Sequence, residues 1–155
     1  MSAVIEETTI DPILEKAREV ATTQGVRYAG SVPPEDAWHL FRSGKAELVD
    51  VRSAEERKFV GQVPGVAHVA WATGTSLLRN PRFEREFEAK FAKDKKILLL
   101  CRSGKRSALA AEALTKVGFR NVFNVLEGFE GDLNDRQQRG SIGGWRRHGL
   151  PWIQD

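Results

Sequence analysis

The sequence predicts an α/β domain with a mainly parallel β-sheet. Short apolar segments typical of strands alternate along the chain with segments of helical periodicity. One apolar segment, residues 97–100, is uniformly aliphatic, as expected for a strand that is buried on both faces of a sheet. The chain has 155 residues, which is about the size of one globular domain.

Two helices are predicted before the alternating part of the chain. The first covers residues 11–24, because Asp11 suits the N-cap, Pro12 the first helical position and Gly25 the end. The second covers residues 34–42. Both have apolar residues at helical spacing, so one face of each is expected to be buried.

Four strands and three helices then alternate. The predicted strands are residues 48–51, 66–71, 97–100 and 122–125. The predicted helices are residues 54–59, 81–92 and 107–117. Three phenylalanines of the helix at 81–92 are spaced by four residues along one face, so we expect them in the core.

The end of the chain is predicted to be irregular. Residues 127–144 are rich in Gly, Asp, Asn, Gln and Arg and indicate a long polar loop, which is often functional or mobile. A short final helix is predicted near Trp145. We therefore divide the chain into an N-terminal helical extension, residues 1–30, and a single domain, residues 31–155, which ends in this loop and helix.

The cysteine and histidine content limits the chemistry. Cys101 is the only cysteine, which excludes an internal disulfide, a CxxC redox pair and a cysteine-rich metal site. The three histidines are far apart and fit no metal-ligand spacing. We expect neither a metal site nor a cofactor.

Charge and hydropathy give expectations about location and partners. The longest apolar run, residues 97–101, is far shorter than the ~20 residues that span a bilayer. Residues 1–10 carry no signal-peptide pattern, so we expect a cytoplasmic protein that does not bind membranes. The net charge is only +3, and the basic residues 146–148 are more typical of a solvated chain end than of a nucleic-acid patch. We expect no nucleic-acid partner.

Residues 101–107 concentrate the reactive groups of the chain. Cys101 follows a predicted buried strand, and open α/β sheets bind ligands at the carboxyl ends of their strands. Ser103 and Gly104 allow backbone N–H groups to point inward as an anion-binding nest, and the next helix adds the positive end of its dipole. The remaining residues of the segment are Arg102, Lys105, Arg106 and Ser107.

These surroundings favour a reactive thiolate at Cys101. The competing interpretation is a buried structural cysteine, because free cysteines are among the most buried residues. Three cations and a glycine within the next five residues favour the reactive thiol.

Four motifs, in the same order, resemble those of the rhodanese family. Residues 101–107 resemble its active-site loop, a cysteine followed by a Gly-x-Arg-Ser ending. The other three motifs are an Asp-x-Arg segment with following acidic residues (48–56), a Gly-x-(Ile/Val)-Pro-Gly turn (61–69) and a strand with a Gly-rich exit (118–129). The resemblance covers residues 32–152.

The resemblance implies a five-stranded, mainly parallel sheet with helices on both faces. It also implies a sulfurtransferase, in which Cys101 takes sulfur from a donor such as thiosulfate and passes it from a persulfide to cyanide or a thiol. The loop backbone would hold the persulfide anion, and the cations of the loop would attract the small anionic donor. A sulfur-relay protein is a further possible partner, and the physiological donor and acceptor stay open.

Supporting roles are expected for residues outside the loop. Asp50 and Arg52 are expected to tie the end of their strand to neighbouring loops through hydrogen bonds. Arg106 is expected to form an ion pair with Glu55 or Glu56 and so to support the loop.

Three other functions compete with sulfur transfer. Cysteine-dependent phosphatases and arsenate reductases place five residues between the cysteine and a catalytic arginine, usually with a histidine before the cysteine. Here four residues separate Cys101 from Arg106, and Leu100 precedes the cysteine, which favours a single sulfur atom over a tetrahedral anion. A non-catalytic partner-binding module and, last, a redox sensor remain as alternatives.

Overall fold

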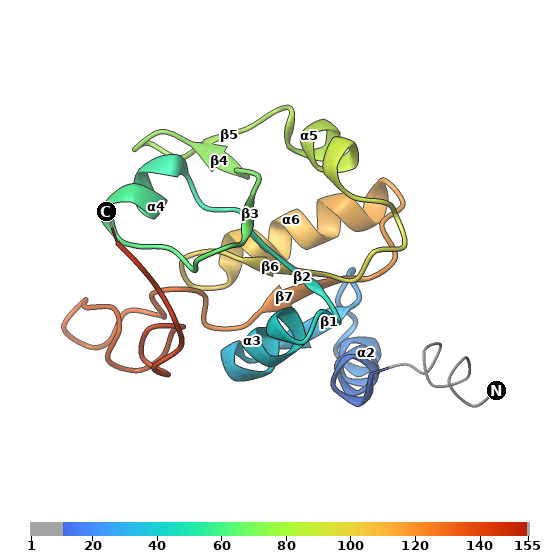
Figure 1. The fold of residues 1–155 in the computed structure, drawn as a ribbon, viewed down its shortest axis with the longest axis horizontal. Helices are drawn as coiled ribbons and strands as arrows, with labels where there is room; N and C mark the ends of the chain where they lie inside the picture. Colours follow the sequence, from blue (N-terminus) through green and yellow to red (C-terminus); the bar gives the residue numbers. More distant parts are fainter. Residues whose placement is uncertain (1–10, 155) are drawn as a thin grey trace.

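Five parallel strands form the main sheet of the computed structural model, which describes residues 11–154 (Figure 1). Their order across the sheet is β1-β7-β6-β2-β3. The strands are β1 (Gly30–Val32), β2 (Glu47–Asp50), β3 (Ala67–His68), β6 (Ile97–Leu100) and β7 (Val122–Val125). The five-stranded parallel sheet that the resemblance implied is confirmed.

Helices cover both faces of this sheet. They are α2 (Pro12–Gln24), α3 (Pro34–Arg42), α4 (Ala54–Phe59), α5 (Phe83–Lys90) and α6 (Lys105–Lys116). Helices α2 and α3 lie on one face, and α5 and α6 lie on the other (Figure 1). Between residues 11 and 154 no helix has the length and apolar character needed to cross a membrane.

Strand β6 contributes to both hydrophobic cores. Leu98 and Leu100 pack in the core with α2 and α3, whereas Ile97 and Leu99 pack in the core with α5 and α6. The same alternation places Cys101 on the α5 and α6 side. Because both faces of β6 are covered, its sequence has no polar alternation.

Helix α2 begins and ends where the sequence predicts. The Asp11 carboxylate accepts a hydrogen bond from the Ile13 N–H at 2.8 Å, and Gly25 takes a left-handed conformation with φ 72°. Leu14 and Ala17 are buried in the core on this side of the sheet. Helix α2 therefore shares the core of the sheet, while residues 1–10 of the predicted extension lie outside the described residues.

Several short strands differ from the prediction. Strand β1 and the antiparallel hairpin of β4 (Ala72–Thr73) and β5 (Leu78–Arg79) were not predicted, because two or three residues are too few to show a period. The strand predicted over residues 66–71 shortens to β3. Hydrogen bonds from Val69 N to Asp50 O and from Trp71 N to Val51 O nevertheless keep the chain beside β2.

The predicted final helix near Trp145 is wrong. Residues 145–149 form turns, in which His148 N donates to Gly144 O at 3.2 Å and Gly149 N donates to Arg146 O at 3.0 Å. Gly149 then takes a left-handed conformation with φ 73°, and a proline follows two residues later. Because both features stop helix propagation, the segment does not extend beyond one turn.

Candidate active site

Cys101 lies at the carboxyl end of β6, at the centre of the sheet, and is 1% exposed. Its Sγ accepts hydrogen bonds from the backbone N–H groups of Gly104 at 3.1 Å and Ser107 at 3.3 Å. The Ser107 hydroxyl lies 3.2 Å from the same sulfur. The loop therefore forms a cradle of donors around one sulfur atom.

The start of α6 strengthens this cradle. The helix begins at Lys105, two residues earlier than predicted, with Gly104 as its N-cap. Gly104 has φ 98°, a left-handed conformation that glycine adopts at little cost, and this turn aims its N–H at the sulfur. Since the N-terminus of a 12-residue helix points at Sγ, both the N–H groups and the helix dipole stabilise negative charge there.

The three cations of the loop have different surroundings in the structure. Arg106 is held by α4, because its two terminal nitrogens bind the Glu56 carboxylate at 2.9 and 2.7 Å. Lys105 is exposed, and Arg102 is half-buried. The expected ion pair of Arg106 is therefore present, with Glu56 as its partner.

Glu56 braces the loop from α4. Its carboxylate accepts hydrogen bonds from the Ser53 N–H at 3.0 Å and the Ser53 hydroxyl at 3.1 Å as part of a capping box. Burial works to raise the pKa of Glu56, but hydrogen bonds from Arg106 and Ser53 outweigh it and hold the pKa below the ordinary 4.5. Burial likewise works to lower the pKa of Arg106, but Glu56 outweighs it and raises that pKa.

This brace predicts a pH-dependent stability. Because the pKa of Glu56 is lower in the folded protein than the ordinary 4.5, its charge stabilises the fold above that pH, and the contribution disappears as the pH falls below it. Glu56→Gln keeps an N3 side chain suited to the capping box but loses the charge. We expect it to lower the free energy of unfolding by about 1–2 kcal/mol at pH 7, with the difference vanishing in acid. Urea unfolding from pH 7 to pH 3 measures this.

Glu88→Gln is the matched control. Glu88 pairs with Lys93 at 2.8 Å, but both side chains are 40% exposed, so its loss is expected to change stability by less than about 1 kcal/mol. If Glu56→Gln lowered the free energy of unfolding by the same amount at pH 3 as at pH 7, the charge of Glu56 would not be the source of the stabilisation.

Asp50 and Arg52 form the buried support below the loop. Both side chains are fully buried, and the Arg52 guanidinium binds Asp50 Oδ2 at 2.8 Å and the Gly61 carbonyl oxygen at 2.8 Å. The guanidinium also lies over the Phe129 ring, 4.3 Å from its centroid. As expected, these residues connect the end of β2 to neighbouring loops.

Asn124 is a site residue that the sequence reasoning missed. It lies buried on β7, its side-chain N–H donates to Gly104 O at 3.2 Å, and its oxygen accepts from the Ser107 hydroxyl. This single amide therefore fixes two residues of the cradle. The available signal was a polar residue within the otherwise apolar strand 122–125.

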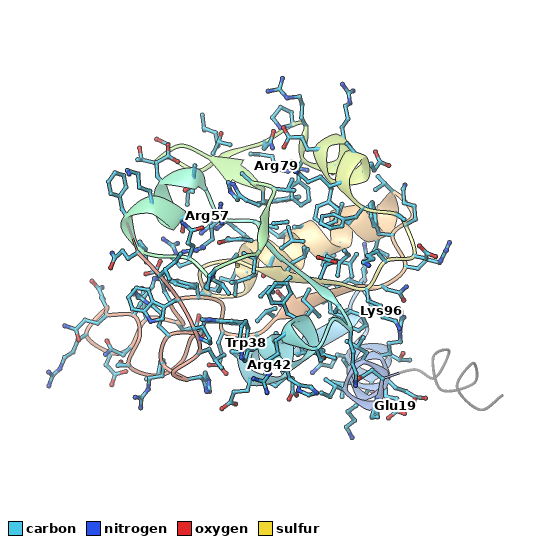
Figure 2. The ribbon with its side chains drawn as sticks, in the orientation of Figure 1. Glu19, Trp38, Arg42, Arg57, Arg79 and Lys96 are labelled. Atoms are coloured by element: carbon cyan, nitrogen blue, oxygen red, sulfur yellow. The ribbon has the colours of Figure 1, made fainter. Side chains whose placement is uncertain are left out.

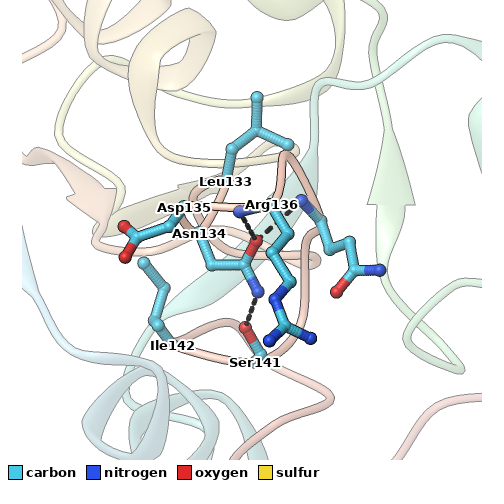
Figure 3. A pocket seen from close by; sticks show the side chains of 7 residues that line it. Leu133, Asn134, Asp135, Arg136, Ser141 and Ile142 are labelled. Carbon is cyan, nitrogen blue, oxygen red and sulfur yellow. Dashed lines mark hydrogen bonds between the residues drawn. The ribbon is translucent and has the colours of Figure 1, made fainter.

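The long loop at 127–144 divides into two parts with different roles. Its first residues touch the active-site loop, since Phe129 N donates to Cys101 O at 2.7 Å and Glu130 N donates to Arg102 O at 2.9 Å. The far part surrounds a polar hollow of about 340 Å³ (Figure 3). There the Asn134 side chain accepts from the N–H groups of Arg136 and Gln138 and donates to Ser141. The Asn134 side-chain amide therefore holds the shape of the loop through these hydrogen bonds.

No metal-binding group is present in the described part of the chain. Between residues 11 and 154, no three His, Cys, Asp or Glu side chains are placed so that they could hold a metal ion. His68 instead makes a 2.7 Å hydrogen bond with Arg52 O, and His148 makes a 2.9 Å contact with Glu127.

Fold and site together define an α/β domain that holds one cysteine sulfur in a backbone cradle at the carboxyl end of a strand in a parallel sheet. The chain belongs to the rhodanese-like domain family, whose model matches residues 33–135. A crystal structure of a Mycobacterium tuberculosis protein is 40% identical, with a TM-score of 0.74, over 83% of this chain and 99% of that one.

Two curated relatives extend the comparison. An uncharacterised protein of Rickettsia prowazekii is 37% identical over 115 residues, which are 73% of this chain and 87% of the relative. The thiosulfate sulfurtransferase GlpE of Actinobacillus succinogenes is 30% identical over 120 residues, 77% of this chain and 86% of the relative. The family is thus established, and its members include a sulfurtransferase.

Proposed function

We propose that this protein is a sulfurtransferase that carries sulfur as a persulfide on Cys101. The observation that supports it most is the cradle, in which two backbone N–H groups and the N-terminus of α6 point at one sulfur atom. Donors aimed at a point where negative charge resides stabilise an anion without reorganisation. A persulfide attached to Sγ meets the same field.

Sulfur loading from thiosulfate follows as a balanced displacement. The Cys101 thiolate attacks the outer sulfur of thiosulfate, a new S–S bond forms, and the bond to the inner sulfur breaks. Sulfite leaves with the electron pair of that bond, and the enzyme keeps a persulfide anion. Transfer to cyanide or a thiol then releases the Cys101 thiolate, so no external oxidant or reductant is needed.

The geometry favours this reaction over phosphate chemistry. A phosphatase loop needs its arginine to bind the oxygens of a tetrahedral anion, but both terminal nitrogens of Arg106 are held by Glu56. The relative that is a thiosulfate sulfurtransferase supports the same choice. The intact cradle also argues against a purely non-catalytic module, which has no need to hold an anionic sulfur.

Mass spectrometry after thiosulfate treatment tests the proposal. We expect the intact protein to gain one sulfur atom, to lose it on addition of cyanide with release of thiocyanate, and to gain none when Cys101 is replaced by serine. Turnover should fall by at least about 10³-fold in that variant, because the covalent step has no other nucleophile.

Two controls make this experiment decisive. The variant Ser141→Ala, in the far loop, should load sulfur as the unmodified protein does. Absence of sulfur gain in the unmodified protein, or rapid hydrolysis of an aryl phosphate without any thiosulfate-dependent gain, contradicts the proposal.

A further inference from the structure

A small pocket of about 220 Å³ lies against the active-site loop. Arg102, the residue after Cys101, forms one wall, and Glu55 and Glu56 at the start of α4 form another. The turn of the β4–β5 hairpin, residues 74–77, contributes the third. Pockets for drug-sized ligands measure roughly 300–1,000 Å³, so this one suits a molecule the size of a single amino acid.

Two charged side chains of this pocket have no partner within the described part of the chain. The Arg102 guanidinium makes no ion pair with any described residue, and its Nε is buried without a hydrogen-bond partner. Glu55 is likewise free of ion pairs and hydrogen bonds there, whereas Glu56 is occupied by Arg106 and Ser53. The pocket thus presents one free cation and one free carboxylate to the same small volume.

This pairing of charges discriminates between ligands. A purely anionic molecule is attracted by Arg102 but repelled by Glu55. A purely cationic molecule is attracted by Glu55 but repelled by Arg102. A zwitterion with an ammonium and a carboxylate group on the same carbon satisfies both side chains and leaves neither charge unpaired in the pocket.

We propose that this pocket binds a small zwitterionic aminothiol, of which free cysteine is the simplest, as the sulfur acceptor. Glu55 holds its ammonium group and Arg102 holds its carboxylate, which directs its thiolate toward the loop. The proposal rests on the persulfide function proposed above and specifies the class of acceptor for that site.

The transfer step is balanced. The acceptor thiol gives its proton to the outer sulfur of the Cys101 persulfide anion, and the resulting thiolate attacks that sulfur. A new S–S bond forms on the acceptor, and the bond to Sγ breaks. Cys101 leaves as the thiolate that the cradle stabilises, and the proton stays on the transferred sulfur. The acceptor departs as a persulfide, with no net oxidation.

Four thiols of similar size test the charge recognition. Cysteine carries both charges, cysteamine only the ammonium, 3-mercaptopropionate only the carboxylate, and 2-mercaptoethanol neither. Protein loaded to completion with thiosulfate is mixed with each thiol, and the loss of the persulfide mass gives kcat/KM. For each thiol, the kcat/KM of a variant is divided by that of the protein without substitutions. This ratio cancels the intrinsic reactivity of the thiol.

The expected pattern differs between two variants. Arg102→Gln should lower kcat/KM about tenfold, or roughly 1.4 kcal/mol, for cysteine and 3-mercaptopropionate, and leave the other two thiols within about twofold. Glu55→Gln should lower it similarly for cysteine and cysteamine and not for 3-mercaptopropionate. Arg42→Gln and Glu19→Gln, on α3 and α2 (Figure 2), are the matched charge controls.

A binding measurement keeps this inference separate from the sulfur chemistry. S-Methylcysteine cannot accept sulfur, so its titration against the unloaded protein by NMR reports the pocket alone. We expect saturable shifts at residues 74–77 and about tenfold weaker binding in each of the two variants. Uniform effects on all four thiols, or no binding of S-methylcysteine, overturn the inference, whereas failure of thiosulfate to load Cys101 overturns only the persulfide function.

Discussion

Replacing Arg52 with methionine is expected to destabilise the domain by about 3–5 kcal/mol. Arg52 and Asp50 are both fully buried and joined by hydrogen bonds at 2.8 to 3.3 Å. Methionine fills similar space, and the Asp50 carboxylate keeps the backbone N–H of residue 52 at 2.9 Å. Its remaining cationic neighbour is then Arg57, whose Nε lies 3.4 Å away and has no hydrogen-bond partner. The Gly61 carbonyl loses its donor as well. A free-energy loss of this size is a large share of the ~5–15 kcal/mol by which domains are stable.

Two further variants identify the cause of the loss. The double variant Asp50→Asn with Arg52→Met removes the stranded charge, so it should be more stable than Arg52→Met alone. Arg79→Met is the exposed counterpart, because Arg79 also lies over an aromatic ring, Trp71, and pairs with Glu84. Arg57 lies on α4 and Arg79 on β5 (Figure 2).

The measurement is chemical unfolding at pH 7. Arg79→Met should change the free energy of unfolding by less than about 1 kcal/mol, because its ion pair is solvated. If Arg52→Met were no more harmful than Arg79→Met, or if the double variant were the least stable of all, the buried pair would not have the structural role assigned to it.

Sequence patterns were sufficient where a single local rule decides the structure. The limits of α2 follow from Asp11 and Gly25, and the buried position of β6 follows from its uniform aliphatic composition. The cradle at Cys101 follows from small residues between a strand and a helix. In each case the relevant residues are close in the sequence, so their effect appears in a short window.

Contacts between distant segments were not accessible in this way. Asn124 reaches the cradle only because β7 lies beside β6 in the sheet, 20 residues after Gly104 in the chain. The final helix was mispredicted because a left-handed Gly149 ended it after one turn. The pocket at Arg102 depends on the β4–β5 hairpin, whose strands have two residues each. Packing decides these features, and no periodic pattern records them.

Gly128→Ala is expected to displace the active-site loop and to abolish most sulfur loading. Gly128 has φ 68°, and a Cβ at this position would lie 2.5 Å from Arg102 O and 2.5 Å from Ser103 N. Both atoms belong to the backbone of the loop, so the overlap cannot be relieved by a side-chain rotation. The left-handed conformation costs about 1–2 kcal/mol for alanine, and the overlap adds about 1–3 kcal/mol.

The overlap acts on the cradle through the backbone. Phe129 N donates to Cys101 O at 2.7 Å, and Glu130 N and Gly131 N both donate to Arg102 O. Moving Gly128 away from Arg102 strains these bonds, and moving Arg102 instead shifts the turn that aims the Gly104 N–H at Sγ. We expect the rate of persulfide formation from thiosulfate, followed by mass spectrometry, to fall by at least about 100-fold, because a 1 Å misplacement alone can cost 10²-fold.

Gly140→Ala separates backbone strain from steric overlap. Gly140 has φ 89°, also left-handed, but a Cβ there meets no atom within 4 Å. It should lose about 1–2 kcal/mol of stability and load sulfur at the normal rate. Equal loading rates in Gly128→Ala and Gly140→Ala would show that the Gly128 contact does not position the loop. A lower rate of sulfur loading in Gly128→Ala alone would establish that the cradle is held in place by close backbone contact between the segments that follow β6 and β7.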